Sequence, residues 1–191
     1  MSPIDEDEAL IAAALKGSAF AWEKLVKRYE SKVYNHGLRL MGNSTDAMDL
    51  MQEVFLGVYR NLHRFRGDAK FSSWLFRIAH NKAVDLNRRK RILSTGNTDN
   101  DGDDGLDKFP ADRNEEPETN LEAQQHNHQI MGMLTSLPFD QRLIVELKVF
   151  QSNTFEEIAE MQGISTNTAK TRFYSALRKL KGVTEETHVL S

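Results

Sequence analysis

Residues Thr154–Lys181 read TFEEIAEMQGISTNTAKTRFYSALRKLK and predict two helices joined by a tight turn. Thr154 and Glu157 have the spacing of a capping box, in which the hydroxyl and the carboxylate bind backbone N–H groups at the helix start. Gly163 permits the left-handed backbone on which many helices end, and Ser165 can cap the helix that follows. Two helices around such a turn are typical of a helix-turn-helix.

The second of these helices has an apolar side and a polar side. Helical spacing places its apolar residues together: Ala169, Phe173, Ala176, Leu177 and Leu180. The other side is polar: Asn167, Thr171, Tyr174 and Arg178, flanked by Lys170 and Ser175. Residues near the helix start are expected to reach the edges of DNA bases. Four basic residues are expected to contact phosphates: Arg172, Arg178, Lys179 and Lys181. Because residues 165–182 contain five bases and no acid, a DNA-recognition helix is favoured over an ordinary helical hairpin.

The rest of the chain predicts an all-α fold with two small domains. Before residue 94, apolar spacing predicts helices over residues 8–15, 20–40, 46–62 and 71–91, with a stop and cap at Gly42–Asp46. Residues 94–120 are rich in Gly, Asp, Asn, Pro and Glu and predict a flexible acidic linker, since they can bury little. We therefore expect one helical domain over residues 1–93 and another over residues 121–191, in which Pro138 begins a helix at its first turn.

Charge is distributed unevenly along the chain, whose net charge is -3. Residues 94–122 contain ten acids against two bases, a net -8, whereas residues 60–91 contain ten bases against two acids, a net +8. Two basic zones separated by an acidic spacer predict two surfaces that bind a polyanion. Solvated helix faces joined by a tether would produce the same pattern, so charge alone leaves both interpretations open.

Several classes of protein are disfavoured by what the 191 residues lack. The chain has no cysteine, and therefore neither disulfides nor a thiolate metal site. No apolar run approaches the ~20 residues needed to cross a bilayer, and no signal-peptide pattern is present, so we expect a cytoplasmic protein without membrane insertion. The absence of a phosphate loop, a nucleophile elbow and an HExxH motif argues against an enzyme and predicts no cofactor. His126 and His128 would point to different sides of a helix, which makes them poor joint metal ligands.

The helix predicted near Asp49–Leu62 combines a core stripe with an exposed apolar residue. The core stripe contains Leu50, Met51, Val54, Phe55, Val58 and Leu62. The opposite face carries Asp49, Gln52, Glu53, Leu56 and Arg60. An apolar residue ringed by polar groups, as Leu56 is here, predicts a docking site for a partner protein, although a lone exposed leucine is also common.

Residues Phe65–Arg91 interleave aromatic and basic side chains. The inner face of the predicted helix contains Leu75, Phe76, Ala79, Ala83 and Leu86. The outer stripe contains Trp74, Arg77, Asn81, Asp85 and Arg88. An aromatic ring at Trp74 could stack on an unpaired base, and Asn81 could hydrogen-bond to base edges. A core tryptophan that closes the domain is the alternative for Trp74, and the two interpretations are compatible.

These stretches together resemble the extracytoplasmic function (ECF) sigma factors of bacteria. Three segments occur in the order and spacing of that family: DLMQEVF (49–55), FRGDAKFSSWLFRIAHNKAVD (65–85) followed by RRKR, and SLPFDQRLIVELKVFQSNTFEEIAEMQGISTNTAKTRFYSALRKL (136–180). The resemblance covers about residues 19–181. It implies a σ2 domain, a flexible linker and a σ4 domain, in a protein that binds core RNA polymerase and directs it to promoter DNA.

The resemblance also implies three sites. The polymerase β′ coiled coil would bind Asp49, Gln52, Glu53, Leu56 and Arg60. The minus-ten element would be read and held open, with one flipped base in a pocket near the loop, by Phe65, Arg66, Lys70, Phe71, Trp74, Arg77, Asn81, Asp85 and Arg88. The minus-thirty-five element would be read by Ser165, Asn167, Lys170, Thr171, Arg172, Tyr174, Ser175 and Arg178. The σ4 domain would also meet the polymerase β flap, and many members of the family are held by an anti-sigma factor.

Three positions depart from the family pattern, and two other functions stay open. Ala169 occupies a position that is more often β-branched in the family, and Gly37 is expected to interrupt a helix that is usually better formed. Ser175 stands where many members have a basic residue. A conventional helix-turn-helix regulator that binds duplex DNA would not need both a docking helix and a base-stacking segment. A pure protein-interaction adaptor would leave the basic zones unexplained.

Overall fold

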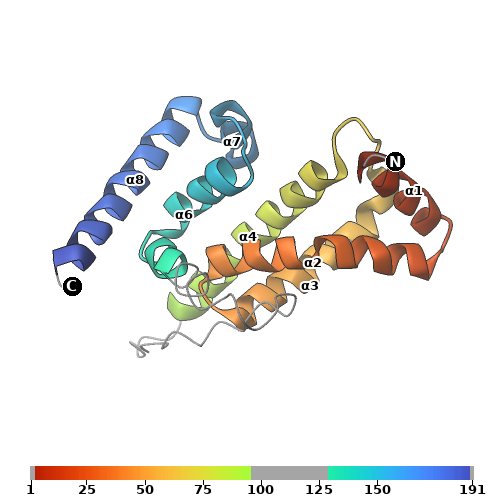
Figure 1. Ribbon diagram of the computed structural model, residues 1–191, viewed down its shortest axis with the longest axis horizontal. Helices are drawn as coiled ribbons and strands as arrows, with labels where there is room; N and C mark the ends of the chain where they lie inside the picture. The colour runs from red at the N-terminus through yellow and green to blue at the C-terminus, as the bar shows by residue number, and fades with distance from the viewer. Residues whose placement is uncertain (1–2, 96–128, 190–191) are drawn as a thin grey trace. The chain divides into compact units, whose positions relative to one another are not determined.

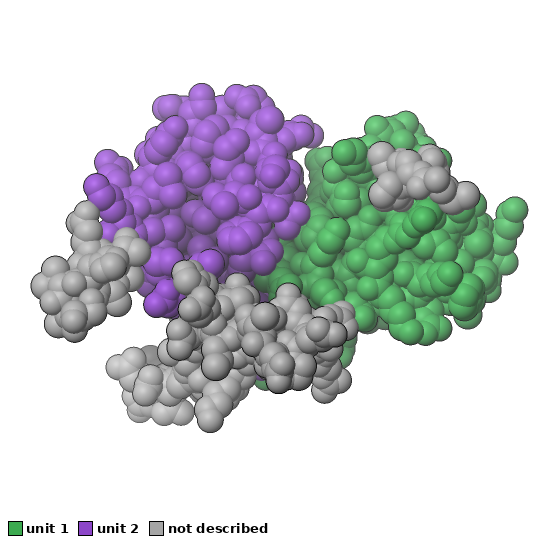
Figure 2. Space-filling model, viewed as in Figure 1, with its two compact units in different colours: residues 1–37, 45–101 green, residues 38–44, 102–191 purple. Residues whose placement is uncertain are grey.

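The computed structural model describes residues 3–95 and 129–189, and every regular element within these ranges is helical. The all-α prediction is therefore confirmed. Contacts divide the chain into two compact units (Figure 2): unit 1 comprises residues 1–37 and 45–101, and unit 2 comprises residues 38–44 and 102–191. Of the predicted linker, residues 94 and 95 end the last helix of unit 1, and residues 96–120 lie outside the described residues.

The N-terminal part of the chain forms four helices and one short 3₁₀ turn (Figure 1). They are α1 (Pro3–Leu15), α2 (Ala19–Met41), α3 (Ser44–Asn61), η1 (Leu62–Arg64) and α4 (Phe71–Thr95). Each predicted helix is present, and Gly42, with a φ of 80°, ends α2 as predicted. Helix α4 extends beyond the predicted end at Arg91, and the Ser94 hydroxyl donates a hydrogen bond to the Lys90 carbonyl, 2.7 Å away, in its last turn.

The core of unit 1 is made by α2, α3 and α4. Its most buried side chains are Leu25, Val33, Leu50, Val54, Val58, Leu75, Ala79 and Ala83. Met51 and Phe55, which were assigned to the core stripe, are only half-buried, whereas Ala47 and Gly57 are buried. Small residues therefore occupy part of the stripe, because they let neighbouring helices approach α3 closely.

Gly37 does not interrupt α2, contrary to the expectation from the sequence, since the helix runs unbroken to Met41. A Cβ atom added at Gly37 would lie 3.1 Å from both the Cα atom and the carbonyl oxygen of Ala47 on α3. The glycine is therefore explained by close packing of two helix backbones. Glycine lowers the helix propensity of α2, but a larger residue at this position would push α2 and α3 apart.

Unit 2 contains the predicted helix-turn-helix. Residues 129–135 are helical, and they are followed by α6 (Phe139–Val145), the π-helical segment η2 (Glu146–Phe150), α7 (Phe155–Gln162) and α8 (Thr166–Val189). Pro138 is the residue before α6 rather than the first residue of the helix, since its ψ of 145° is not helical. The missing N–H of Pro138 still costs no hydrogen bond, because N–H groups at the start of a helix have no acceptor within the helix.

The predicted turn chemistry of residues 154–168 is confirmed in detail. Thr154 and Glu157 form both hydrogen bonds of a capping box, with N···O distances of 3.2 and 2.7 Å. Gly163 ends α7 in the left-handed conformation, with a φ of 64°. The Ser165 hydroxyl accepts a hydrogen bond from the Thr168 N–H at 3.0 Å and so caps α8.

The inner side of α8 packs largely as predicted. Ala169 and Ala176 are fully buried, and Phe173 and Leu180 pack with Leu134, Leu137 and Val145. Leu177 was assigned to the same side but is 39% exposed, because it lies at the edge of the apolar stripe. The core of unit 2 is small, and the helix-turn-helix therefore depends on its caps as well as on burial.

Candidate polymerase and nucleic-acid interfaces

Helix α3 presents the polar face that the sequence assigned to a partner protein. Asp49, Gln52, Leu56 and Arg60 are exposed, and Leu56 keeps 49% of its surface in solvent. Glu53 is half-buried, and its carboxylate pairs with the Lys82 ammonium at 3.0 Å. That hydrogen bond, and then the charge of Lys82, lower the pKa of Glu53. Glu53 therefore also fastens α3 to α4.

Two further exposed apolar residues extend this face and were missed in the sequence. Met48 is 47% exposed and Tyr59 is 63% exposed. With Gln52 and Leu56 they lie at intervals of four, four and three residues, so helical spacing alone would have placed them on one stripe. Trp22 of α2 supports the stripe, because its ring centroid lies 5.1 Å from that of Tyr59. The exposed apolar surface is thus a row rather than a single leucine.

An aromatic cluster precedes and begins α4. The ring centroids of Phe65, Phe71 and Trp74 lie 5.4 to 5.8 Å from one another. Phe71 is buried and also packs on Tyr29, whereas Phe65 and Trp74 are half-buried. Trp74 is therefore both a packed residue and an accessible one, so the two interpretations of it are compatible in the structure.

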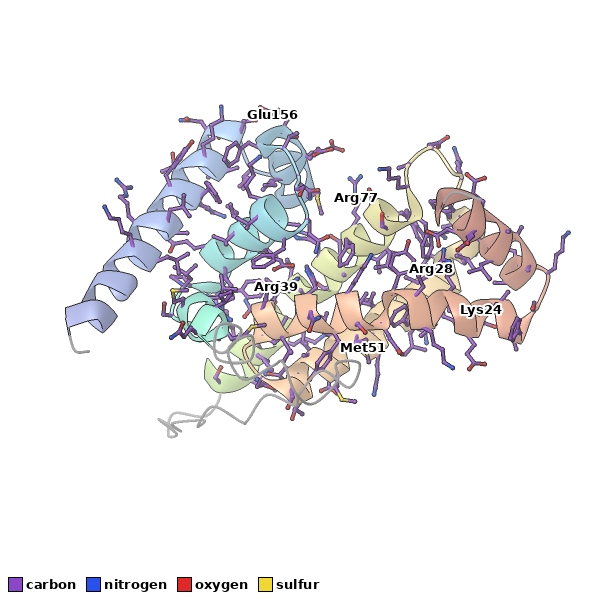
Figure 3. All side chains as sticks on the ribbon, viewed as in Figure 1. Lys24, Arg28, Arg39, Met51, Arg77 and Glu156 are labelled. Carbon is purple, nitrogen blue, oxygen red and sulfur yellow. The ribbon has the colours of Figure 1, made fainter. Side chains whose placement is uncertain are left out.

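The outer stripe of α4 follows this cluster. Arg77, Asn81 and Arg88 are exposed, and Figure 3 labels Arg77 on α4. Asp85 pairs with Arg88 at 3.1 Å, which reduces the charge that this turn offers to a phosphate. On the preceding loop, the basic side chains of Arg66 and Lys70 are exposed on either side of Gly67, where the backbone bends with a φ of 77°. The arrangement places cationic, amide and aromatic groups along one continuous segment.

A pocket of about 550 Å³ lies between α1, Tyr29 and this loop. We call it the α1 pocket, and its lining is Asp7, Glu8, Ile11, Tyr29, Phe65, Gly67, Asp68, Ala69, Lys70, Phe71 and Ser72. Figure 1 shows α1 beside the loop that leads into α4. The family resemblance implied a pocket near the loop of residues 65–71 but not the contribution of α1, because the acidic pattern of residues 5–8 indicates only a solvated helix face.

Of the residues predicted to contact duplex DNA at the start of α8 and along it, some are exposed and others pack against α6. Ser165, Asn167, Lys170, Thr171, Tyr174 and Arg178 are exposed. Arg172 and Ser175 are half-buried and contact α6: the Arg172 guanidinium lies 3.9 Å from the Asp140 carboxylate, and Ser175 accepts a hydrogen bond from the Gln141 amide at 3.3 Å. These two residues therefore hold the recognition helix against α6.

A second aromatic cluster underlies the start of the recognition helix. The rings of Phe155, Phe173 and Tyr174 lie 5.5 to 6.4 Å apart. The ammonium groups of Lys148 and Lys170 lie 4.8 and 5.9 Å from the centre of the Phe155 ring. Sequence reasoning missed Phe155 and Lys148, because the two residues belong to different helices and come together only in the folded unit.

The residues that the structure describes contain neither a candidate metal site nor a membrane-spanning helix. Within residues 3–95 and 129–189, no group of three His, Cys, Asp or Glu side chains could hold a metal ion. His126 and His128 lie outside these ranges. None of the described helices is both long enough and apolar enough to cross a bilayer.

Comparison with known proteins assigns both halves of the chain. The family model "Sigma-70 region 2" matches residues 25–92, and "Sigma-70, region 4" matches residues 127–180. The ECF RNA polymerase sigma factor SigW of Bacillus subtilis is 32% identical over 170 residues, which cover 86% of this chain and 90% of SigW. The ECF RNA polymerase sigma-E factor of Escherichia coli K12 is 30% identical over 179 residues, which cover 89% of this chain and 90% of that protein.

Two solved structures have a similar fold. CnrH, solved in complex with the cytosolic domain of CnrY, has a TM-score of 0.60 at 24% identity, covering 95% of this chain and 99% of that one. RpoE of Bartonella quintana, solved with the anti-sigma factor NepR, has a TM-score of 0.65 at 19% identity, covering 85% and 96%. With the sequence matches over both regions, these findings show that the chain belongs to the ECF family of RNA polymerase sigma factors.

Proposed function

We propose that this sigma factor holds promoter DNA at two points while it is bound to core RNA polymerase, and that it acts by binding rather than by catalysis. Unit 1 would open and read the minus-ten element, and unit 2 would read the minus-thirty-five element. The observation that carries the proposal is that the two units present different surfaces. Unit 1 has aromatic rings beside exposed basic side chains and Asn81, and unit 2 has a polar helix face without acidic residues.

The division of work follows from what each surface can bind. Unstacked bases are bound by aromatic rings and hydrogen-bonding side chains, which Phe65, Trp74 and Asn81 provide. Duplex DNA is read by a helix in the major groove, and Lys170 and Tyr174 lie on the exposed side of α8. Extruding a base costs a few kcal/mol, and stacking returns about 1–3 kcal/mol per base. Unit 1 therefore recovers only part of the cost of opening, and polymerase must supply the rest.

Core polymerase would be bound by the apolar row of α3. Asp49, Gln52, Glu53, Leu56 and Arg60 are the predicted contacts, and Met48 and Tyr59 extend them along the helix. A central apolar strip with a polar rim is the usual arrangement of a protein–protein interface. We assign the predicted contact with the β′ coiled coil to this row and the contact with the β flap to unit 2.

Regulation by an anti-sigma factor is part of the proposal. The solved relative from Bartonella quintana is bound to an anti-sigma factor. An anti-sigma factor that covered the apolar row of α3 would exclude polymerase, because both partners would need the same surface. The whole chain would act in the cytoplasm, where polymerase is found, with one domain over residues 1–93, the other over residues 121–191 and an acidic connection between them.

Transcription with purified core polymerase tests the proposal directly. Adding the full chain should allow initiation on promoters that core polymerase alone does not use. The free chain should bind the same promoter DNA weakly. A chain that shifts duplex DNA tightly without polymerase, and supports initiation on no promoter tested, would instead be a conventional helix-turn-helix regulator.

Variants separate the two DNA surfaces. Asn81→Ala should impair opening and change the preference within the minus-ten element, and Asn87→Ala on the same helix is its control. Lys170→Ala and Tyr174→Ala should weaken promoters that depend on the upstream element, with Lys24→Ala as the control for the loss of one surface charge. If both sets of variants lost activity equally on promoters with and without an upstream element, the division of work would be refuted.

A further inference from the structure

The α1 pocket has an apolar floor and a charged rim. Ile11, Tyr29 and Phe71 are buried and form the floor, and the half-buried ring of Phe65 stands at one side. Glu8, Asp68 and Lys70 are exposed around the opening. A volume of about 550 Å³ lies within the ~300–1,000 Å³ range of pockets that bind small molecules, and it is ample for one nucleobase.

Helix α1 is fastened to the pocket by an ion-pair network. The Asp7 carboxylate accepts a hydrogen bond from the Arg28 guanidinium at 2.7 Å and another from the Tyr29 hydroxyl at 2.5 Å. Burial, and then the bond to Asp7, raise the pKa of Tyr29, so the hydroxyl keeps the proton that it donates. Arg28, which Figure 3 labels on α2, also pairs with Glu6. The first turns of α1 are therefore held in one position, with Glu8 beside the loop.

The charges of the rim indicate which part of a nucleotide can enter. Asp7 is already paired with Arg28 and Tyr29, so the rim carries the exposed carboxylates of Glu8 and Asp68 against Lys70, which is the one cationic side chain among the lining residues. Such a lining disfavours a phosphate. It suits a neutral base, whose ring can lie on the apolar floor while the polar edge meets the rim.

The chemistry of a carboxylate also discriminates among bases. A carboxylate only accepts hydrogen bonds, and cytosine and adenine present an amino donor to it at N4 and N6. Thymine and guanine present a carbonyl oxygen at the corresponding place, and two acceptors facing each other repel. Lys70, on the other side of the opening, can donate to a ring nitrogen or carbonyl of the base.

We propose that Glu8 of α1 is a specificity-determining residue of the α1 pocket and selects a flipped base that carries an exocyclic amino group, cytosine or adenine, against thymine. Asp7, Arg28 and Tyr29 are positioning residues that hold Glu8 in place. This inference rests on the proposed opening of the minus-ten element by unit 1. It adds α1, which lies outside the segment that matches the region 2 model, to the surface that reads the promoter.

The test uses polymerase assembled from core and the full chain, bound to fork templates whose minus-ten non-template strand is single-stranded. Each cytosine of that strand is changed in turn to uracil, and each adenine to purine, so that one amino group is removed at a time. At one position the loss should weaken the complex about tenfold, within the range of a good base contact. Glu8→Gln should reduce this ratio to about threefold or less, since a neutral amide accepts a weaker hydrogen bond from the amino group and can turn a donor toward the carbonyl oxygen of uracil.

Two control variants make the outcome decisive. Glu30→Gln removes an exposed acid of α2 that does not line the pocket and should leave the ratio unchanged. Asp68→Asn removes an acid of the loop, and a ratio that follows Asp68 but not Glu8 would overturn the proposal. Equal binding of all modified templates would also overturn it. Initiation by the wild type on the unmodified template reports separately on the proposed function, and circular dichroism shows whether Glu8→Gln is folded.

Discussion

Replacing Gly37 by alanine adds one methyl group where α2 meets α3. The new Cβ would lie 3.1 Å from the Cα atom and from the carbonyl oxygen of Ala47, which is fully buried. Both atoms belong to a helix backbone and cannot turn aside as a side chain can. Gly57→Ala is the matched substitution, because its Cβ would lie 3.3 Å from the Ile78 Cγ2 atom and 3.4 Å from the Lys82 Cε atom. Those atoms are side-chain ends that can shift.

Both substitutions gain helix propensity, but only Gly37→Ala overpacks against a rigid backbone. Each gains about 0.8–1.0 kcal/mol of helix propensity in a helix interior. Overpacking against a rigid neighbour costs about 1–3 kcal/mol. We therefore expect Gly37→Ala to lower the free energy of unfolding of unit 1 by about 1 kcal/mol. Gly57→Ala should leave it unchanged or raise it by up to about 1 kcal/mol, because its neighbours can move.

Urea denaturation followed by tryptophan fluorescence measures this difference in the full chain. The only two tryptophans, Trp22 and Trp74, both belong to unit 1, so the signal reports on that unit. With a urea dependence of about 1–3 kcal/mol per molar, a loss of 1 kcal/mol lowers the midpoint by roughly 0.3–1 M. If Gly37→Ala were as stable as Gly57→Ala, close packing of α2 on α3 would not be the reason for Gly37.

Three other substitutions test contacts that position the interfaces. Thr154→Ala should lower the stability of unit 2 by about 1 kcal/mol through loss of the capping box, with Thr154→Ser as the rescue, in thermal melts by circular dichroism. Tyr29→Phe should destabilise unit 1 by about 1.5–3 kcal/mol, because the buried Asp7 carboxylate loses the hydrogen bond that the Tyr29 hydroxyl donates. A change below about 0.5 kcal/mol in urea denaturation would refute that. The lowered pKa of Glu53 means that its pair with Lys82 stabilises the protein above the ordinary pKa of about 4.5 and is lost as the pH falls below it. The wild type should therefore lose up to about 0.5 kcal/mol more than Glu53→Gln between pH 5 and pH 3, a small value because both side chains are partly exposed, and equal losses would contradict the pairing.

Local signals predicted the helices and their ends. The caps at Thr154 and Ser165 and the left-handed turn at Gly163 depend on atoms a few residues apart, so the sequence contains all that is needed. Apolar spacing likewise predicted the sides of α3, α4 and α8 that are buried. It failed at Leu177, and in part at Met51 and Phe55, because a residue at the edge of a stripe can be buried or exposed according to what packs beside it.

Tertiary packing decided which of the exposed side chains are available to a partner. Gly37 was expected to interrupt α2, but α2 is unbroken there and the Ala47 backbone lies against Gly37. Ser175, a predicted DNA contact, also accepts a hydrogen bond from Gln141, which the sequence did not indicate. The contribution of α1 to the pocket could not be predicted, because the two walls are separated by about sixty residues and their approach depends on the bonds of Asp7 to α2. The sequence by itself thus determined the helices, their caps and the family. Long-range contacts determined which side chains share a surface, because periodicity carries no information on what lies opposite a helix.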